Sequence, residues 1–226
     1  MPTLTAVWKE IDSCDFCKKE CNELQHILGA GKIKNPKLMV VFINPTSRNI
    51  SSDKEWKGLR FPFIGRKSPW NIFEKVGWID QNLFQEIKNN ENKWSYQFAE
   101  KVCSSLSKRG VYITNIVKCT GKDATLPSIS KIKSQSSLFE QEIEAVNPQI
   151  IVSFGSLPTK ALLKTDIKMS KFYKDVIAHK TNFYDIKIKD KTFKVFPCYY
   201  PIGRGSPKKA VQMLMGLNSY LSNQDV

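Results

Sequence analysis

Short apolar runs alternate with longer segments of helical spacing along most of this chain. Three runs have the length and the β-branched or aromatic content of buried strands, and they cover residues 38–43, 111–116 and 149–154. Each run has glycine, asparagine or proline at one or both ends, as is typical where a strand stops. Because helical segments lie between the runs, the pattern predicts a mostly parallel sheet with helices on both faces.

Helices are predicted where apolar positions recur three and four residues apart or where proline opens a first turn. They cover residues 14–28, a segment from Pro69 onward, much of 81–108, and 132–146, 157–164 and 207–221. Two further β-rich runs, 183–188 and 192–196, predict a hairpin or an adjacent pair of strands. No repeat or linker is evident, so we expect one α/β domain over residues 1–226, built as an α/β/α sandwich.

A strong excess of positive charge points to the kind of partner. The 226 residues include 35 lysines and arginines against 21 aspartates and glutamates, which gives a formal net charge of +14 at pH 7. This balance favours a polyanion such as DNA; a solvated surface in a lysine-rich proteome is the alternative. No apolar run is long enough to cross a bilayer, and the amino terminus lacks a secretory signal. We expect a soluble cytoplasmic protein, associated with the nucleoid, without a membrane partner.

The six cysteines do not suggest a disulfide framework in a chain without a secretion signal. Cys14 and Cys17 form a CxxC pair, and Cys21 follows closely enough to share one metal site. Cys103, in an apolar helical stretch, and Cys198, at an expected strand end, are interpreted as packed thiols.

The run 111–119 carries the most informative polar residue, Asn115, near its carboxyl end. Ligands of open α/β sheets are held at that end of the strands. An asparagine amide offers a donor and an acceptor side by side, which suits the Watson–Crick edge of a nucleobase; a cap for the next turn is the alternative role. Neither a catalytic Ser/His/Asp set nor a phosphate-cradling GxxxxGK[ST] is evident, which disfavours kinases and ATPases.

Several motifs in order resemble the uracil-DNA glycosylase superfamily, above all its iron–sulfur branch. They are Cys14-x-x-Cys17, Gly29-Ala-Gly31, Phe61-Pro-Phe-Ile-Gly-Arg66, Val111-Tyr-Ile-Thr-Asn-Ile-Val-Lys-Cys119 and Asn147-Pro-Gln-Ile-Ile-Val-Ser-Phe-Gly155. The segment Phe42-Ile-Asn-Pro-Thr46 is instead similar to the GINPG motif of the mismatch-specific uracil/thymine branch. The resemblance implies a monofunctional glycosylase that flips uracil, or a modified or mismatched pyrimidine, out of DNA and hydrolyses its N-glycosidic bond.

The resemblance also implies roles for residues of the base pocket. Phe63 takes the place of the aromatic that stacks on the flipped base, Asn115 reads the edge of the base, and Ile43 lies beside it. Asn44 takes the place of the residue that positions the hydrolytic water, because cleavage with oxocarbenium character needs water placement more than proton removal. Core packing for Phe63 and a loop cap for Asn44 are the structural alternatives.

The last motif, residues 199–205, departs from the family pattern. By this resemblance, Tyr200 replaces the histidine that donates to the base oxygen. Arg204 lies where the minor-groove loop pushes into the vacated base stack, and a phosphate contact is its alternative role. Together with Lys208, Lys209 and Arg66, Arg204 is expected to contact DNA. Because the histidine is lost, a catalytically inactive nucleic-acid-binding relative is the second hypothesis, and a metal-dependent nuclease is a third and weaker one. We expect a monomer.

The cysteines match three of the four cluster ligands of the iron–sulfur branch, namely Cys14, Cys17 and Cys119. The fourth ligand falls at Gln135, and residues 120–150 contain no cysteine. Cys21 is the candidate substitute, so a [4Fe-4S] cluster, zinc and no metal all stay open. The chemistry itself requires no cofactor. Residues 79–110 exceed the usual connection of the family and are expected to add helix.

Overall fold

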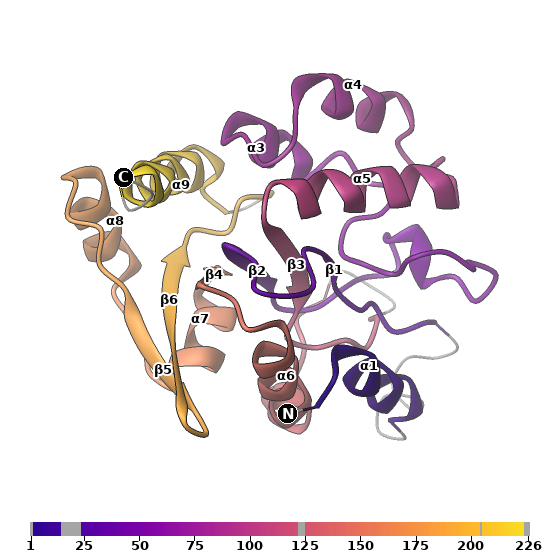
Figure 1. The fold of residues 1–226 in the computed structure, drawn as a ribbon, viewed down its shortest axis with the longest axis horizontal. Coiled ribbons are helices and arrows are strands. Elements are labelled where there is room, and N and C mark those ends of the chain that lie inside the picture. Colours follow the sequence, from indigo (N-terminus) through magenta and orange to yellow (C-terminus); the bar gives the residue numbers. More distant parts are fainter. Residues whose placement is uncertain (1, 15–23, 122–124, 204, 224–226) are drawn as a thin grey trace.

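The structure, a computed structural model, describes residues 2–14, 24–121, 125–203 and 205–223 (Figure 1). Cys17, Cys21 and Arg204 therefore lie outside the described residues. None of the described helices is both long and apolar enough to span a membrane.

A six-stranded sheet with strand order β1-β3-β2-β4-β6-β5 runs through the described part of the chain. Its strands are β1 (Ala30–Gly31), β2 (Leu38–Phe42), β3 (Val111–Asn115), β4 (Ile150–Phe154), β5 (Tyr184–Ile188) and β6 (Lys191–Cys198). The four central strands are parallel, whereas β1 and β5 are antiparallel edges. The predicted α/β class, the three buried strands and the hairpin are thus confirmed.

Helices cover both faces of this sheet (Figure 1). One face carries α3 (Trp70–Lys75), α4 (Gln81–Asn89), α5 (Tyr96–Lys108), α8 (Met169–Ile177) and α9 (Pro207–Ser222); the other carries α1 (Leu4–Ser13), α6 (Ile129–Val146) and α7 (Ser156–Leu163). A 3₁₀ turn covers Ile50–Ser52. The expected extra helix within residues 79–110 is present as α4 and α5, and α5 packs against β1 and β3.

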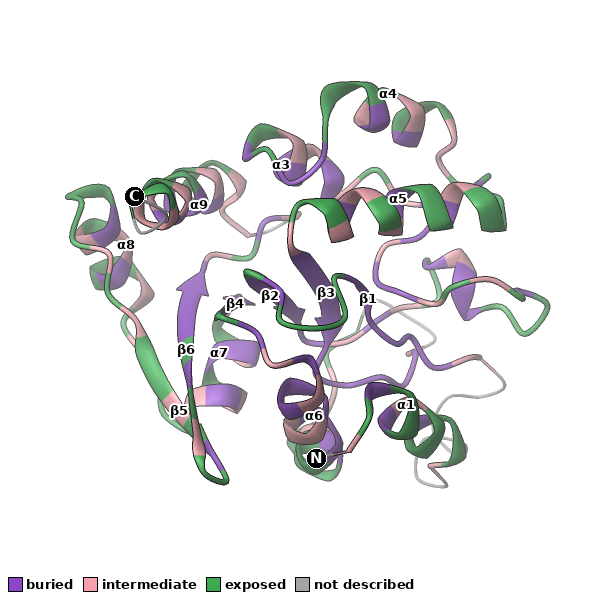
Figure 2. Ribbon diagram, viewed as in Figure 1, coloured by how far each residue is buried: buried purple, intermediate pink, exposed green. Residues whose placement is uncertain are grey.

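Strands β2, β3 and β4 are buried at every position, which Figure 2 shows as a continuous buried centre. Along β2, Val40 packs into one hydrophobic cluster and Met39 and Val41 into the cluster on the opposite face. A strand buried on both faces has no polar alternation, and this explains the uninterrupted apolar runs of the sequence.

The prediction of a helix over residues 14–28 is wrong for residues 24–28, which the structure describes and which are not helical. Their backbone groups bond to distant segments instead: the Ile27 amide donates to the Lys118 carbonyl at 3.0 Å, and the Leu28 amide to the Arg60 carbonyl at 2.8 Å. Two helices, α1 and α8, were not predicted. In α1, Leu4, Val7 and Ile11 are buried at helical spacing, so the signal was present in the sequence.

Candidate active site

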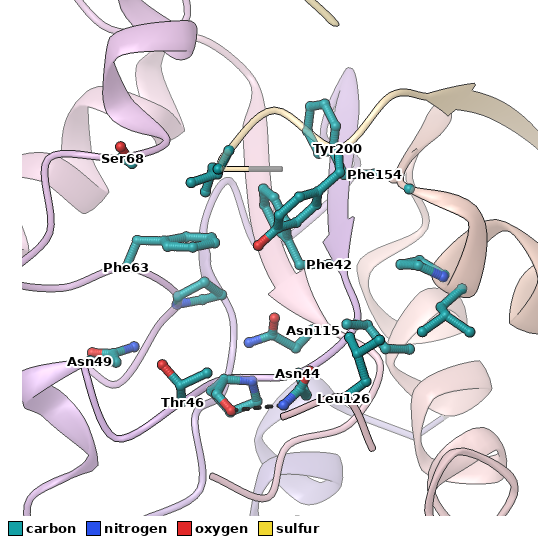
Figure 3. A pocket seen from close by; sticks show the side chains of 18 of the residues that line it. Phe42, Asn44, Thr46, Asn49, Phe63, Ser68, Asn115, Leu126, Phe154 and Tyr200 are labelled. Carbon is teal, nitrogen blue, oxygen red and sulfur yellow. Dashed lines mark hydrogen bonds between the residues drawn. The ribbon is translucent and has the colours of Figure 1, made fainter. Parts of the chain in front are cut away.

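A pocket of about 910 Å³ opens at the carboxyl ends of the central strands. The last residues of β2, β3 and β4 (Phe42, Asn115 and Phe154) all line it, and so does Tyr200, two residues beyond β6. Figure 3 shows these side chains converging from separate strands and loops. The sheet topology therefore assembles the pocket at the edge where parallel α/β sheets hold their ligands.

Asn115 is the most deeply buried polar group of the pocket, with only 1% of its surface exposed. Its Nδ2 is buried and has no hydrogen-bond partner within the described part of the chain. A buried donor left unpaired costs about 1–3 kcal/mol. A ligand with an acceptor at its edge would remove this cost, so the site is suited to a carbonyl-bearing group and not to an aliphatic one.

Asn44 lies at the rim of the same pocket and is held by two backbone contacts. Its Nδ2 donates to the Pro45 carbonyl at 3.1 Å (Figure 3) and also to the Thr125 carbonyl at 3.2 Å. Since both contacts are with acceptors, they fix which end of the amide is the nitrogen. The Oδ1 of Asn44 is thereby left as an acceptor, and it can orient a water molecule.

Phe63 forms an aromatic wall beside these two amides. Its backbone has φ 69°, a left-handed conformation that is unusual for an aromatic residue. The carbonyl oxygen of Phe63 accepts from Trp70 Nε1 at 3.2 Å, and its ring meets Phe42 edge-on at 4.7 Å. Phe63 is only partly buried, so its ring lines the pocket as well as touching the core. A flat ligand can stack there.

Tyr200 turns its hydroxyl group into the pocket above Asn115 (Figure 3). Burial raises the pKa of this phenol above its ordinary value, so the hydroxyl keeps its proton at neutral pH. Its ring meets that of Phe42 edge-on with centroids 6.3 Å apart. Tyr200 can thus donate a hydrogen bond, although as a far weaker acid than a protonated histidine.

The two loops that carry Asn44 and Asn115 are joined by backbone hydrogen bonds beyond the strands. The Val117 amide donates to the Ile43 carbonyl at 2.9 Å, and the Ser47 amide donates to the Gly121 carbonyl at 3.0 Å. Ile43 itself is buried and lines the pocket. These bonds extend the pairing of β2 and β3 and fix the relative positions of the two amides.

A buried polar network supports the second loop from the opposite face of the sheet. Lys118 Nζ contacts Glu142 Oε2 and Thr114 Oγ1, and Tyr112 donates to Glu142 Oε1 at 2.7 Å. Lys118 and Glu142 are 1% and 0% exposed. Burial lowers the pKa of Lys118, and the neighbouring Glu142 carboxylate opposes that effect. Sequence reasoning missed this network, because Glu142 lies 24 to 30 residues beyond the three side chains that it binds.

The basic residues predicted to contact DNA are not all near the pocket. Arg66 lines it and donates to Asn92 Oδ1 at 3.1 Å, whereas Lys208 and Lys209 are exposed at the start of α9 and do not line it. Lys209 Nζ lies over the rings of Tyr173 and Tyr199. Arg48 also lines the pocket; sequence reasoning missed it, although its place in the loop after Asn44 was a signal.

The described cysteines only partly fit the predicted metal site. Cys14 and Cys119 belong to one small cluster, and Gln135, at the position of the expected fourth ligand, approaches Cys14 Sγ with its Nε2 at 3.8 Å. Within the described ranges, no three potential ligands gather at one point. Cys119 is disulfide-bonded, which the sequence analysis did not anticipate. Because a disulfide sulfur is not a thiolate ligand, this bond would have to be reduced before Cys119 could hold a metal.

Comparison with known proteins relates the chain to one family. A family model described as "Uracil DNA glycosylase superfamily" matches residues 28–220. A protein of Saccharolobus solfataricus named Type-4 uracil-DNA glycosylase is 32% identical over 89% of this chain and 76% of its own length. Proteins with the same name from Sulfurisphaera tokodaii and Archaeoglobus fulgidus are 25% and 22% identical, over 89% of this chain and 75% and 82% of their own lengths.

Proposed function

Since this chain belongs to the uracil DNA glycosylase superfamily, we propose that it is a monofunctional DNA glycosylase. Its substrate is uracil in DNA, and it hydrolyses the bond between the base and the deoxyribose. The bond from C1′ to the base nitrogen breaks, water supplies the new oxygen on C1′, and the base leaves with the electron pair of the broken bond. The products are the free base and an abasic site.

The observation that carries this proposal is the buried, unpaired Nδ2 of Asn115 inside the pocket. A flipped uracil presents a carbonyl oxygen next to an N–H group, and the amide of Asn115 offers the matching donor and acceptor. Stacking on Phe63 would replace the neighbours that the base loses when it leaves the duplex. The Tyr200 hydroxyl would donate to a base oxygen as negative charge develops there.

Asn44 completes the proposed reaction by placing the water. Its amide nitrogen is already committed to two carbonyl groups, so its oxygen would accept a proton of the water and aim the lone pair of that water at C1′. Holding the attacking atom in line contributes more than proton removal, because the sugar develops positive charge before the new bond forms. Ile43 would flank the base beside it.

A modified or mismatched pyrimidine is the second candidate substrate. Tyr200 stands where the enzymes that this chain resembles have histidine. A phenol is a weaker hydrogen-bond donor than an imidazolium, so it suits a base that is a better leaving group than uracil. A relative that binds DNA without catalysis is the alternative from another class.

One assay separates these candidates. Duplexes that contain uracil, a thymine mismatch or a modified cytosine are incubated with the protein, and one half of each sample is then treated with alkali. Strand breaks that appear only after alkali indicate a monofunctional glycosylase, and the base that yields them names the substrate. Breaks without alkali indicate a lyase or a nuclease. Tight binding without breaks on any substrate would contradict the proposal and favour the inactive relative.

We also propose that the cysteines hold a metal in the reduced protein, as a [4Fe-4S] cluster or as zinc. Cys14 and Cys119 would be two ligands, and Cys17 and Cys21, which lie outside the described residues, would supply the others. The metal would cross-link segments that are distant in sequence, and it would take no part in base removal. Anaerobically purified protein should absorb visible light and contain iron, or contain zinc. Folded protein without either metal would refute this assignment.

A further inference from the structure

A second cleft, of about 460 Å³, opens on the face of the sheet that carries α6 and α7. Helix α6 forms one wall, and α7 with the edge strand β5 forms the other; Figure 1 shows α7 between α6 and β5. Among the described residues, Leu157 alone lines both this cleft and the pocket that contains Asn115. The cleft is therefore a separate surface next to the proposed active site.

The walls of the cleft are mainly apolar, and part of this apolar surface is open to water. On α6 the lining positions recur three and four residues apart, at Ile129, Ile132, Ser136, Phe139 and Ile143. One stripe of the helix therefore faces the cleft. Ile129 is 73% exposed, the largest exposed fraction of any large apolar side chain in the described part of the chain. Exposed apolar surface of this kind, rimmed by polar groups, is typical of an interaction site.

Positive charge surrounds the apolar surface. Four exposed lysines line the cleft, namely Lys133 on α6, Lys160 and Lys164 in and just after α7, and Lys187 on β5. Two of them have acidic neighbours, because Lys160 contacts Asp166 at 2.8 Å and Lys164 contacts Glu140 at 3.6 Å. Within the described ranges, the other two have no carboxylate partner. A partner with acidic side chains would complete these charges.

The shape of the cleft favours a helix as its occupant. The stripe from Ile129 to Ile143 extends roughly 21 Å at 1.5 Å per residue, which is long for a compact ligand. An amphipathic helix laid along such a groove inserts apolar side chains at three- and four-residue spacing. A second copy of this chain is disfavoured, because each copy carries a formal charge of +14. DNA would use the lysines but would leave the apolar walls in water.

We propose that this cleft is a docking site for a partner protein that presents an acidic amphipathic helix. Apolar side chains of that helix fill the groove between α6 and α7, and its glutamates or aspartates face the lysines at the rim. Since the cleft shares only Leu157 with the pocket among the described residues, the partner is held without filling the pocket. The inference does not depend on the proposed function.

The test uses a fluorescein-labelled synthetic peptide and the full-length protein. The peptide has about 18 residues, enough to cover the cleft as a helix, with leucines at three- and four-residue spacing and glutamates on both flanks. One control peptide has the same composition in scrambled order, and another has lysine in place of every glutamate. Fluorescence anisotropy should show binding of the first peptide, and binding of each control should be about tenfold weaker or less.

A substitution in the apolar wall tests where the peptide binds. Ile129→Asp places a carboxylate in the cleft, so it should weaken binding of the acidic peptide about tenfold or more. Ile177→Asp is the matched control, because Ile177 is 45% exposed on α8, which packs on the opposite face of the sheet. It should bind the peptide as wild type does, and melting curves should show that both variants are folded.

A charge reversal tests the complementarity of the rim. The double variant Lys133→Glu, Lys187→Glu should lose affinity for the acidic peptide and gain affinity for the lysine peptide. Lys171→Glu, Lys174→Glu changes the net charge equally on α8, where both lysines are exposed, and should keep the preference of wild type.

Three results would overturn the proposal. Equal binding of the ordered and scrambled peptides, or equal effects of the two charge reversals, would mean that net charge alone attracts the peptide. Displacement of the peptide by duplex DNA, with weaker DNA binding by the reversal at Lys133 and Lys187, would assign the cleft to DNA. Failure of wild type to bind the acidic peptide would leave the cleft without this occupant. Excision of uracil is measured separately and bears on none of these outcomes.

Discussion

Phe42 and Asn115 lie directly opposite each other in the register of the parallel strands β2 and β3. Residues in register on neighbouring strands point to the same face of a sheet, so the phenyl ring and the amide form adjoining parts of one pocket. The ring also stacks on Phe154 with centroids 5.0 Å apart. This aromatic surface keeps water away from the Asn115 amide, and in a site of low dielectric constant each hydrogen bond from that amide discriminates more strongly.

Replacing Asn44 by alanine should leave DNA binding nearly unchanged and lower the rate of base removal. Loss of a positioning group at a reacting centre can reduce kcat roughly a hundredfold. Single-turnover excision, measured beside equilibrium binding, separates the two effects. Asn49→Ala is a useful comparison, because Asn49 also lines the pocket but uses its side chain to bind Ser51 and the Phe61 carbonyl. It should reduce the melting temperature instead. Equal kcat for Asn44→Ala and wild type would remove Asn44 from the mechanism.

Asn115 should govern the choice of base. Asn115→Asp replaces the buried donor by an acceptor, so excision should shift toward bases that offer a donor, such as the amino group of cytosine. Discrimination against uracil should change by about tenfold or more, since each unmatched buried polar group costs 1–3 kcal/mol. Competition between two labelled substrates in one tube measures this ratio directly. A variant that folds and keeps the base preference of wild type would show that Asn115 does not read the base.

The pH dependence of excision should be set by a phenol at Tyr200. Burial raises the pKa of Tyr200. The phenol is therefore fully protonated at neutral pH, and it loses its donating proton only as the pH rises above the ordinary tyrosine pKa of about 10. Tyr200→His should move the change to near neutrality, because an imidazolium donor disappears above a pKa of about 6.5. Rates from pH 6 to pH 9 under single-turnover conditions compare the two profiles. A fall in the wild-type rate within that range that Tyr200→Phe abolishes would contradict the assignment.

The strands and the pocket edge could be predicted because both leave local signals. A run such as 38–43 marks a buried strand, and the residues that follow it must lie at the carboxyl edge of a parallel sheet. The family predicted from ordered motifs is confirmed by a match over residues 28–220. Asn44, Phe63, Asn115 and Tyr200 do line one pocket, although their roles stay predictions.

The features that the sequence did not predict depend on contacts between distant segments, and such contacts produce no periodic pattern in the sequence. The partner of Asn44, the carbonyl of Thr125, is 81 residues away, and no pattern in the sequence marks a backbone carbonyl as an acceptor. Residues 24–28 looked helical in isolation, but bonds to loops near Arg60 and Lys118 outweigh that preference. Tertiary contacts routinely override weak helical propensity.

Two lysines at the start of α9 should make different contributions. Lys208 is exposed, so Lys208→Ala should lower the salt dependence of DNA binding by about one unit of slope without changing base preference. Lys209 lies over the rings of Tyr173 and Tyr199 at 5.3 and 5.2 Å, so Lys209→Ala should in addition lower thermal stability. Binding titrations at several salt concentrations and melting curves distinguish the two. An unchanged slope in both variants would exclude this end of α9 from the DNA interface.

The buried pair of Lys118 and Glu142 should show strong coupling in a double-mutant cycle. Glu142→Gln leaves the Lys118 ammonium buried without its counter-charge, and breaking such a pair costs about 3–5 kcal/mol of unfolding free energy. Lys118→Met removes the charge that Glu142 neutralises, so it should cost a similar amount. In the double variant no buried charge remains, and the new glutamine oxygen can still accept from the hydroxyl of Tyr112, which now binds Glu142 at 2.7 Å. The double variant should therefore be more stable than either single variant, as urea unfolding would measure. Strictly additive losses would mean that the pair contributes only as two separate side chains, and that the loop after β3 is held by its backbone bonds alone.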